Sequence, residues 1–143
     1  MIKLRKFSES DLRAVRKIER ASFPGRKPRP LEKYVREHPE ECIVAENENK
    51  VVGYIVGRVK QNSIGVIAFL AVEPSSRGKG IGEKLIRHLA NGFEKKNIKE
   101  TLLYVRARND TAIALYQKLG FAISKKIEKY YRDGDDALVM EKG

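Results

Sequence analysis

The hydrophobic and polar positions at the start of the chain follow three successive patterns. Residues 2–7 alternate apolar and basic side chains, as a half-buried strand does. Apolar side chains then recur at helical spacing through residues 8–22, where Ser8 and Asp11 form a pair typical of a helix start. A short amphipathic segment follows at residues 31–38 and stops before a proline. The pattern therefore predicts a strand followed by two helices.

Short apolar runs replace the helical spacing in the middle of the chain. The runs 42–46, 51–59 and 64–72 are separated by tight polar connections, which predicts an antiparallel meander. The third run is apolar almost throughout, so we expect both of its faces to be covered.

The last part of the chain alternates between helical and strand patterns. Apolar side chains recur every fourth position from Ile81 to Phe93, which predicts a helix that ends near residue 96. The predicted element order is β-α-α-β-β-β-α-β-α-β-β, an α/β fold with a central, mostly antiparallel mixed sheet and helices on both faces. A length of 143 residues fits one domain, residues 1–143. The remaining strand, helix and hairpin are expected at residues 101–107, 110–120, and 121–131 with 136–142.

Charge narrows the class of partner. Thirty Lys and Arg against nineteen Asp and Glu give a net charge of +11, which favours nucleic acid, a membrane surface or a phosphate-rich small molecule. Charge alone does not choose among them. No apolar run approaches the roughly 18 residues of a membrane span, and the first residues are too charged for a signal peptide. We therefore expect a cytoplasmic protein without a membrane partner.

Cysteine and histidine are too rare for a disulfide or a metal site. Cys42 is the only cysteine and lies in an apolar run, so we expect a buried thiol. His38 and His88 are far apart in the sequence and form no metal-ligand spacing, so no metal is expected.

The stretch "VEPSSRGKGIGEKLIRHLA" has three glycines at the start of the helix predicted from Ile81. A helix start exposes unpaired amides and a partial positive charge, and glycines let a phosphate approach them. The segment matches neither a Walker A loop nor the G-x-G-x-x-G dinucleotide fingerprint. The alternative is a flexible turn with no ligand.

The motif "RGKGIG" is similar to the R-x-x-G-x-G/A signature of the Gcn5-related N-acetyltransferases (GNAT). The segments "LAVEPSSRGKGIGEKLI", "VRARNDTAIALYQKLGF" and "YYRDGDDALVM" resemble successive motifs of the branch that acetylates ribosomal proteins and protein N-termini. The resemblance implies acetyl-CoA as cosubstrate, no metal, and a strand before the glycines that diverges from its neighbour. It also implies a set of cofactor-binding residues: Leu70, Ala71, Val72, Arg77, Gly78, Lys79, Gly80, Ile81, Gly82, Glu83, Asn109 and Tyr116.

The resemblance further implies direct attack of a neutral amine on the acetyl carbonyl. Tyr116 would be the general acid, and a strand-end amide, that of Val72, would stabilise the oxyanion. Where relatives commonly carry a glutamate as base, this chain has Tyr104, so a water relay or Glu73 would take that role. The alternatives are a core tyrosine for Tyr116, a helix cap for Asn109 and an ordinary turn carboxylate for Glu73.

The acceptor is expected to be the N-terminal α-amine of a protein, possibly a ribosomal one. In the resembling branch, residues corresponding to Phe23, Tyr130 and Tyr131 line the peptide groove. Phosphate attraction would also allow ribosome association. The alternatives are a small-amine acceptor (polyamine, aminoglycoside or amino acid) and a non-catalytic module that senses acetyl-CoA or accompanies nucleic acid. The sequence leaves the oligomeric state open.

Overall fold

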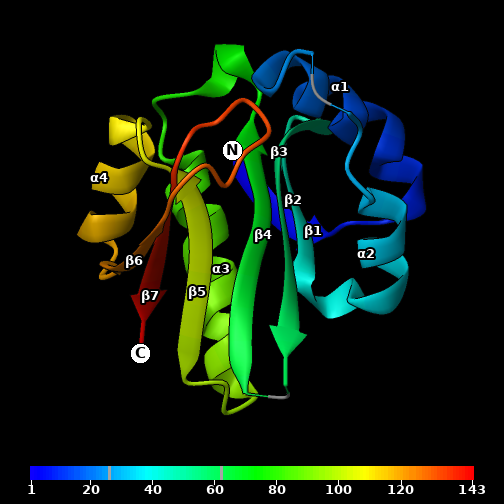
Figure 1. The fold of residues 1–143 in the computed structure, drawn as a ribbon. Coiled ribbons are helices and arrows are strands. Elements are labelled where there is room, and N and C mark those ends of the chain that lie inside the picture. Colours follow the sequence, from blue (N-terminus) through cyan, green and yellow to red (C-terminus); the bar gives the residue numbers. More distant parts are fainter. Residues whose placement is uncertain (26, 62) are drawn as a thin grey trace.

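The computed structural model describes residues 1–25, 27–61 and 63–143, and its element order is the predicted one (Figure 1). Three short 3-10 turns join the longer elements: η1 (Glu9–Asp11), η2 (Pro39–Glu41) and η3 (Pro74–Ser76). The strands and helices are β1 (Ile2–Lys6), α1 (Leu12–Ser22), α2 (Leu31–Glu37), β2 (Cys42–Asn47), β3 (Lys50–Lys60), β4 (Ile64–Val72), α3 (Ile81–Lys95), β5 (Glu100–Arg106), α4 (Asp110–Lys118), β6 (Ala122–Ile127) and β7 (Ala137–Lys142).

The strands form one sheet in the order β1-β2-β3-β4-β5-β7-β6. Among the described residues β4 and β5 pair in parallel, and the other neighbours pair antiparallel. This confirms the predicted meander and the mixed sheet. No helix in the described part of the chain is long and apolar enough to cross a membrane.

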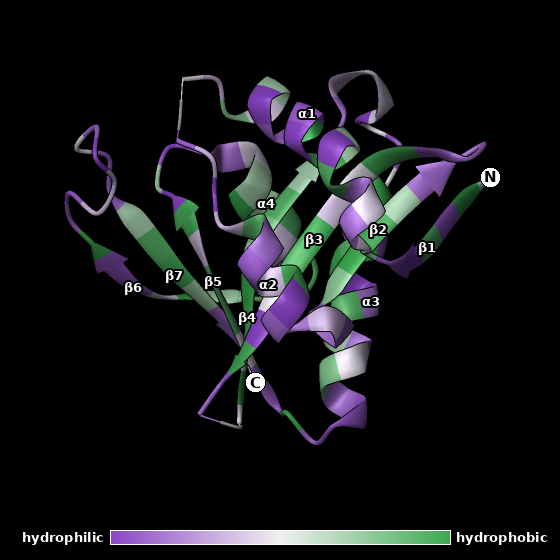
Figure 2. Cartoon of the chain, turned by 90° about the vertical axis from the view of Figure 1, so that its right-hand side faces the viewer, coloured by the Kyte–Doolittle hydropathy of each residue, from purple (hydrophilic) through white to green (hydrophobic). Residues whose placement is uncertain are grey.

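Helices cover both faces of the sheet, as the apolar run of β4 predicted. In Figure 1, α1 and α2 lie to the right of the central strands, and α3 lies behind β4 and β5. Each side has its own buried cluster, and the cluster beneath α1 and α2 contains the buried thiol of Cys42. Figure 2 shows apolar strands in the centre and hydrophilic outer surfaces on the helices, as burial of apolar area requires.

The pairing of β4 with β5 ends halfway along both strands. Ile64–Ile67 pairs with Glu100–Leu103, and no further pair forms as each strand continues. Seen from the side in Figure 2, the two halves of the sheet diverge from this point. The predicted divergence of the strand before the glycines is therefore present.

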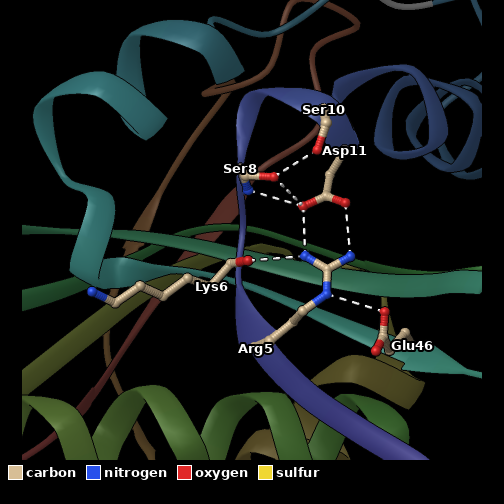
Figure 3. A network of polar contacts seen from close by, with 6 residues as sticks. All are labelled: Arg5, Lys6, Ser8, Ser10, Asp11 and Glu46. Atoms are coloured by element: carbon tan, nitrogen blue, oxygen red, sulfur yellow. Dashed lines mark hydrogen bonds and ion pairs between the residues drawn. The ribbon is translucent and has the colours of Figure 1, made fainter. Parts of the chain in front are cut away.

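The start of α1 is held by the predicted Ser8–Asp11 pair (Figure 3). The Ser8 amide donates to Asp11 Oδ2 at 2.9 Å, and Arg5 on β1 donates two hydrogen bonds of 2.8 Å to the same carboxylate. Arg5 also donates to Glu46 on β2 at 3.0 Å. Arg5 therefore lowers the pKa of the buried Asp11 carboxyl and joins β1, β2 and the helix start.

The hairpin at the end of the chain is shorter than predicted. We expected its first strand to include Tyr130 and Tyr131, but β6 ends at Ile127, and residues 128–136 form a connection that we call the tyrosine loop. The Lys129 amide donates to Asp136 Oδ1 at 2.9 Å, and Lys129 has a positive φ of 52°. This turn ends the strand before Tyr130 and Tyr131, so the predicted extent of the strand, residues 121–131, was wrong.

Candidate active site

The turn of residues 77–82, here called the glycine turn, leads from β4 into α3. Gly78 and Gly80 have φ values of 80° and 79°, and Gly80 is the N-cap residue of α3. A residue with a Cβ pays about 1–2 kcal/mol in this left-handed region. Apart from the adjoining residues, no atom of the described chain lies within 4 Å of a Cβ built at either glycine. The open backbone and the unpaired amides of the first helical turn fit a bound phosphate.

Cations surround the glycine turn, and the carboxylate that follows it, Glu83 in the first turn of α3, is neutralised. Glu83 accepts hydrogen bonds from Lys118 at 3.0 Å and from Arg87 at 3.1 Å, and both cations, Lys118 first, lower its pKa. Within the described residues, Lys79 and Lys84 have no ion-pair partner. The start of α3 therefore presents positive charge to a ligand.

The side chain of Arg77 does not lie over the turn where a phosphate contact was expected. Its Nε donates to the Val72 carbonyl at 3.0 Å, and one Nη donates to the Ser22 hydroxyl at 3.0 Å. These bonds tie the end of β4 to the end of α1. Only the backbone of Arg77 is therefore in a position to contact a phosphate at the turn.

The end of β4 has backbone groups that no neighbouring strand uses. Leu70 and Val72 lie opposite Ile55 and Gly53, while the Glu73 amide donates to the Val52 carbonyl at 2.8 Å. Because ladder bonds alternate along an antiparallel pair, Leu70 and Val72 direct their amides away from β3, toward the side that β5 has left. The two amides are therefore available to a ligand.

Ala71 differs from these two neighbours. By the same alternation its backbone pairs with Tyr54 on β3, and its methyl group is buried beneath α1 and α2. Ala71 therefore has no free backbone group with which to make the expected cofactor contact.

A cavity of about 590 Å³ opens where β4 and β5 diverge, and we call it the central cavity. The end of α1, strands β3, β4 and β5, helix α4 and the tyrosine loop contribute to its lining. Glu73 and Val72 do not line it, nor does the glycine turn. The predicted site residues brought together there are Leu70, Asn109, Tyr116, Phe23, Tyr130 and Tyr131.

Tyr116 enters the cavity from α4 and is 9% exposed. Its ring packs edge-on against Phe121 with centroids 6.0 Å apart. Burial first, and the nearby Tyr131 second, raise the pKa of Tyr116 to about 12. The hydroxyl therefore keeps its proton at neutral pH and is a hydrogen-bond donor.

Asn109 caps α4, as one of the two sequence interpretations predicted. Its Oδ1 accepts a hydrogen bond from the Ala112 amide at 3.1 Å. The amide nitrogen of the side chain stays available for a ligand in the cavity, so capping and cofactor binding are compatible.

Three tyrosine rings form one wall of the cavity. Tyr104 on β5 stacks on Tyr130 with centroids 5.3 Å apart, and Tyr130 packs edge-on against Tyr131 at 5.1 Å. Tyr104 and Tyr130 are 40% and 49% exposed. The exposed phenols can hydrogen-bond to an acceptor, while the ring faces cover its apolar parts.

Arg106, at the end of β5, holds the tyrosine loop in place. It donates hydrogen bonds to Asp133 at 2.9 and 3.0 Å and to Asp135 at 3.3 Å. Its guanidinium also lies 4.1 Å from the centroid of the Tyr131 ring. The acidic run after Tyr131 therefore has a structural purpose, which is to anchor the loop on β5.

The opposite wall of the cavity comes from the connection after α1. Phe23 follows α1, and the guanidinium of Arg29 lies 4.0 Å from its ring centroid and 4.6 Å from that of Phe69 on β4. The buried carboxylate of Glu19 lies 3.8 Å from Arg29 and accepts a hydrogen bond from Arg16 at 3.0 Å. Glu19 thus holds Arg29 from inside the protein, and Arg29 in turn holds this wall of the cavity.

Glu73 lies outside the cavity, although it was the first alternative for the missing base. Lys50 donates to it at 2.9 Å and Ser76 at 3.2 Å, and the Lys50 contact lowers the pKa of Glu73. A carboxylate held in this way takes up a proton less readily than a free one, so we do not assign it a catalytic role.

Three arginines in the cavity lining were missed by the sequence interpretation: Arg29, Arg58 and Arg106. No Asp or Glu among the described residues lines the cavity. The acidic residues next to Tyr130 and Tyr131 could have indicated a cation such as Arg106, because carboxylates beside a predicted binding pair need a cation to hold them in place. Arg29 and Arg58 had no such signal among many scattered basic residues.

The strands diverging beside a phosphate-fitting turn, with a central cavity between them, define an N-acetyltransferase fold. The Acetyltransferase (GNAT) family matches residues 12–121, and the chain belongs to it. The chain is an N-acetyltransferase, and acetyl-CoA is the cosubstrate of this family. Within the described residues no group of three or more His, Cys, Asp or Glu side chains could hold a metal ion.

Similar proteins narrow the branch. The chain is 40% identical over 141 residues to an uncharacterized N-acetyltransferase of Methanocaldococcus jannaschii, covering 97% of this chain and 90% of that one. It is 33% identical over 144 residues to the N-alpha-acetyltransferase of Sulfurisphaera tokodaii, covering 92% and 86%. The crystal structure of Ard1 from Thermoplasma volcanium superposes with a TM-score of 0.94 at 30% identity, over 99% of this chain and 96% of that one.

Proposed function

We propose that the protein transfers the acetyl group of acetyl-CoA to the N-terminal α-amine of a protein, by direct attack in a ternary complex. The observation that carries the proposal is the central cavity, where Tyr116 and the end of β4 meet two walls built on Phe23 and the tyrosine loop. Relatives named N-alpha-acetyltransferases support the choice of acceptor.

The glycine turn and the start of α3 are assigned to the pyrophosphate. Their amides bind the phosphate oxygens, and Lys79, which has no ion-pair partner among the described residues, adds a positive charge. The open backbone groups of Leu70 and Val72 and the side-chain amide of Asn109 bind the arm that leads into the cavity. Acetyl-CoA then supplies a thioester carbonyl as the electrophile.

The proposed step needs a hydrogen-bond donor for the carbonyl oxygen, a donor for the leaving sulfur and an acceptor for the amine proton. The Val72 amide donates to the carbonyl oxygen as negative charge develops there. Tyr116, protonated because its pKa is raised to about 12, donates a hydrogen bond to the leaving sulfur. An α-amine has a pKa of about 7.7–8.0, so roughly 10% is neutral at pH 7. Water in the exposed part of the cavity therefore removes the amine proton without a carboxylate base.

The charge of the cavity argues against polycationic acceptors. Arg29, Arg58 and Arg106 line it, and no Asp or Glu among the described residues does. Polyamines and aminoglycosides carry several positive charges and would meet repulsion there. An α-amine on a peptide brings a single charge, which it loses before attack.

An acetylation assay tests this function. Release of free CoA is measured over a panel of peptides with different N-terminal residues and over a panel of polyamines, with wild type and Tyr116→Phe. We expect turnover with peptides and at least tenfold slower turnover in the variant. Turnover with polyamines alone would refute the protein acceptor, and CoA binding without any release would favour a sensor.

A further inference from the structure

Arg58 lies on β3 and faces the central cavity. The methyl group of an alanine at Gly57 would contact Leu89 of α3 and the backbone of β4, so Gly57 faces the far side of the sheet. Side chains alternate along a strand, so Arg58 points to the other face, where α2 and the cavity lie. There it lines the cavity and is partly buried.

The other two arginines of the cavity already have carboxylates within the protein. Arg29 lies 3.8 Å from Glu19, and Arg106 is held by Asp133 and Asp135. In the part of the chain that the structure describes, Arg58 has no ion pair, hydrogen bond or ring contact through its side chain.

A partly buried cation with no partner favours an anion from outside. Walls of low dielectric constant strengthen the attraction over that in bulk water, and a guanidinium binds a carboxylate through two parallel hydrogen bonds. The aromatic rings of Tyr34 and Phe69, which also line the cavity and pack edge-on with centroids 5.3 Å apart, add apolar surface to these walls.

We infer that Arg58 selects acceptors that carry a carboxylate side chain within their first residues. The inference rests on the proposed function, because it assigns the side chain that accompanies the α-amine into the cavity. Acidic N-terminal segments are therefore the preferred substrate class. Basic segments are disfavoured by the same unpaired charge of Arg58.

The test compares peptides that differ only in Glu against Gln at the first, second or third position. Steady-state release of CoA gives kcat and KM for each peptide with wild type, Arg58→Gln and Arg58→Glu. Lys60→Gln is the matched control, because Lys60 lies on the same strand, is exposed and does not line the cavity. Affinity for CoA checks that each variant keeps its fold.

We expect wild type to favour Glu over Gln in kcat/KM by about five- to tenfold at one of these positions, chiefly through KM. The ratio falls to near one in Arg58→Gln, inverts in favour of Gln in Arg58→Glu and is unchanged in Lys60→Gln. A ratio near one in wild type, or one that persists in Arg58→Gln, overturns the inference and leaves the proposed function standing. Absence of release with every peptide overturns both.

Discussion

The phosphate-binding role that we propose for the glycine turn leads to a prediction about Gly80→Ala. Gly80 has a φ of 79° and caps α3. Apart from the adjoining residues, a methyl group there would meet no atom of the described chain within 4 Å, so the folded protein has space for it. A phosphate bound to the amides of this turn would occupy that space. The substitution should therefore affect the ligand more than the fold.

The expected magnitudes follow from these two effects. Left-handed alanine costs about 1–2 kcal/mol in unfolding free energy, which lowers the melting temperature by about 3–6 °C for a chain of this size. Loss of one charge-assisted hydrogen bond to phosphate costs about 1.5–3 kcal/mol. We therefore expect affinity for CoA to fall by roughly tenfold to a hundredfold.

Gly134→Ala provides the matched control. Gly134 has a φ of 89° and no described atom within 4 Å of its Cβ position, but it belongs to the tyrosine loop. Calorimetric titration with CoA and thermal melts should give both variants a similar loss of stability, with weaker CoA binding only in Gly80→Ala. Equal CoA affinity in wild type and Gly80→Ala would refute a phosphate site at this turn.

Three further predictions concern catalysis, stability and the acceptor wall. Tyr116→Phe should lower kcat about tenfold to a hundredfold with little change in the KM for CoA. Since the pKa of Tyr116 is about 12, the wild-type pH–rate profile should show no loss of activity from this residue up to about pH 10. A fall in rate centred near pH 8 or 9 that vanishes in Tyr116→Phe would contradict this. Asp11→Asn should cost about 2 kcal/mol in unfolding free energy. Because the folded pKa of Asp11 lies below its ordinary 3.8, its contribution is present at neutral pH and is lost as pH falls below about 4; urea unfolding at pH 7 and pH 3 measures it, and an equal cost at both pH values would contradict the ion pair with Arg5. Arg106→Gln should raise the KM for peptide several-fold and leave CoA affinity unchanged, because Arg106 anchors the loop that carries Tyr131; an unchanged peptide KM would show that the loop needs no anchor.

The features that the sequence predicted well depend on neighbours in the chain. The order of elements, the Ser8–Asp11 pair and the cap at Asn109 are set by local spacing and by hydrogen bonds over a few residues. The glycine turn belongs to the same group, because positive φ and a helix start are both local properties.

The features that it missed depend on residues far apart in the chain. Tyr130 was placed on the first strand of the predicted hairpin, but Arg106 and two aspartates hold the segment as a loop. Arg77 was assigned to phosphate by its motif, yet its side chain bonds to Ser22, 55 positions away. Spacing along the chain carries no information on which of many basic residues finds a distant partner.

The early end of the pairing between β4 and β5 has a consequence for local opening. The amides of Leu70 and Val72 face away from β3 and have no strand beside them, so they lack the protection that the rest of the sheet provides. In the absence of CoA their hydrogens should exchange with solvent faster than those of Tyr54 and Ile55 in the middle of β3. The end of β4, where we propose that acetyl transfer takes place, is thus less protected than the middle of the sheet, and occupancy by the cosubstrate should slow its exchange.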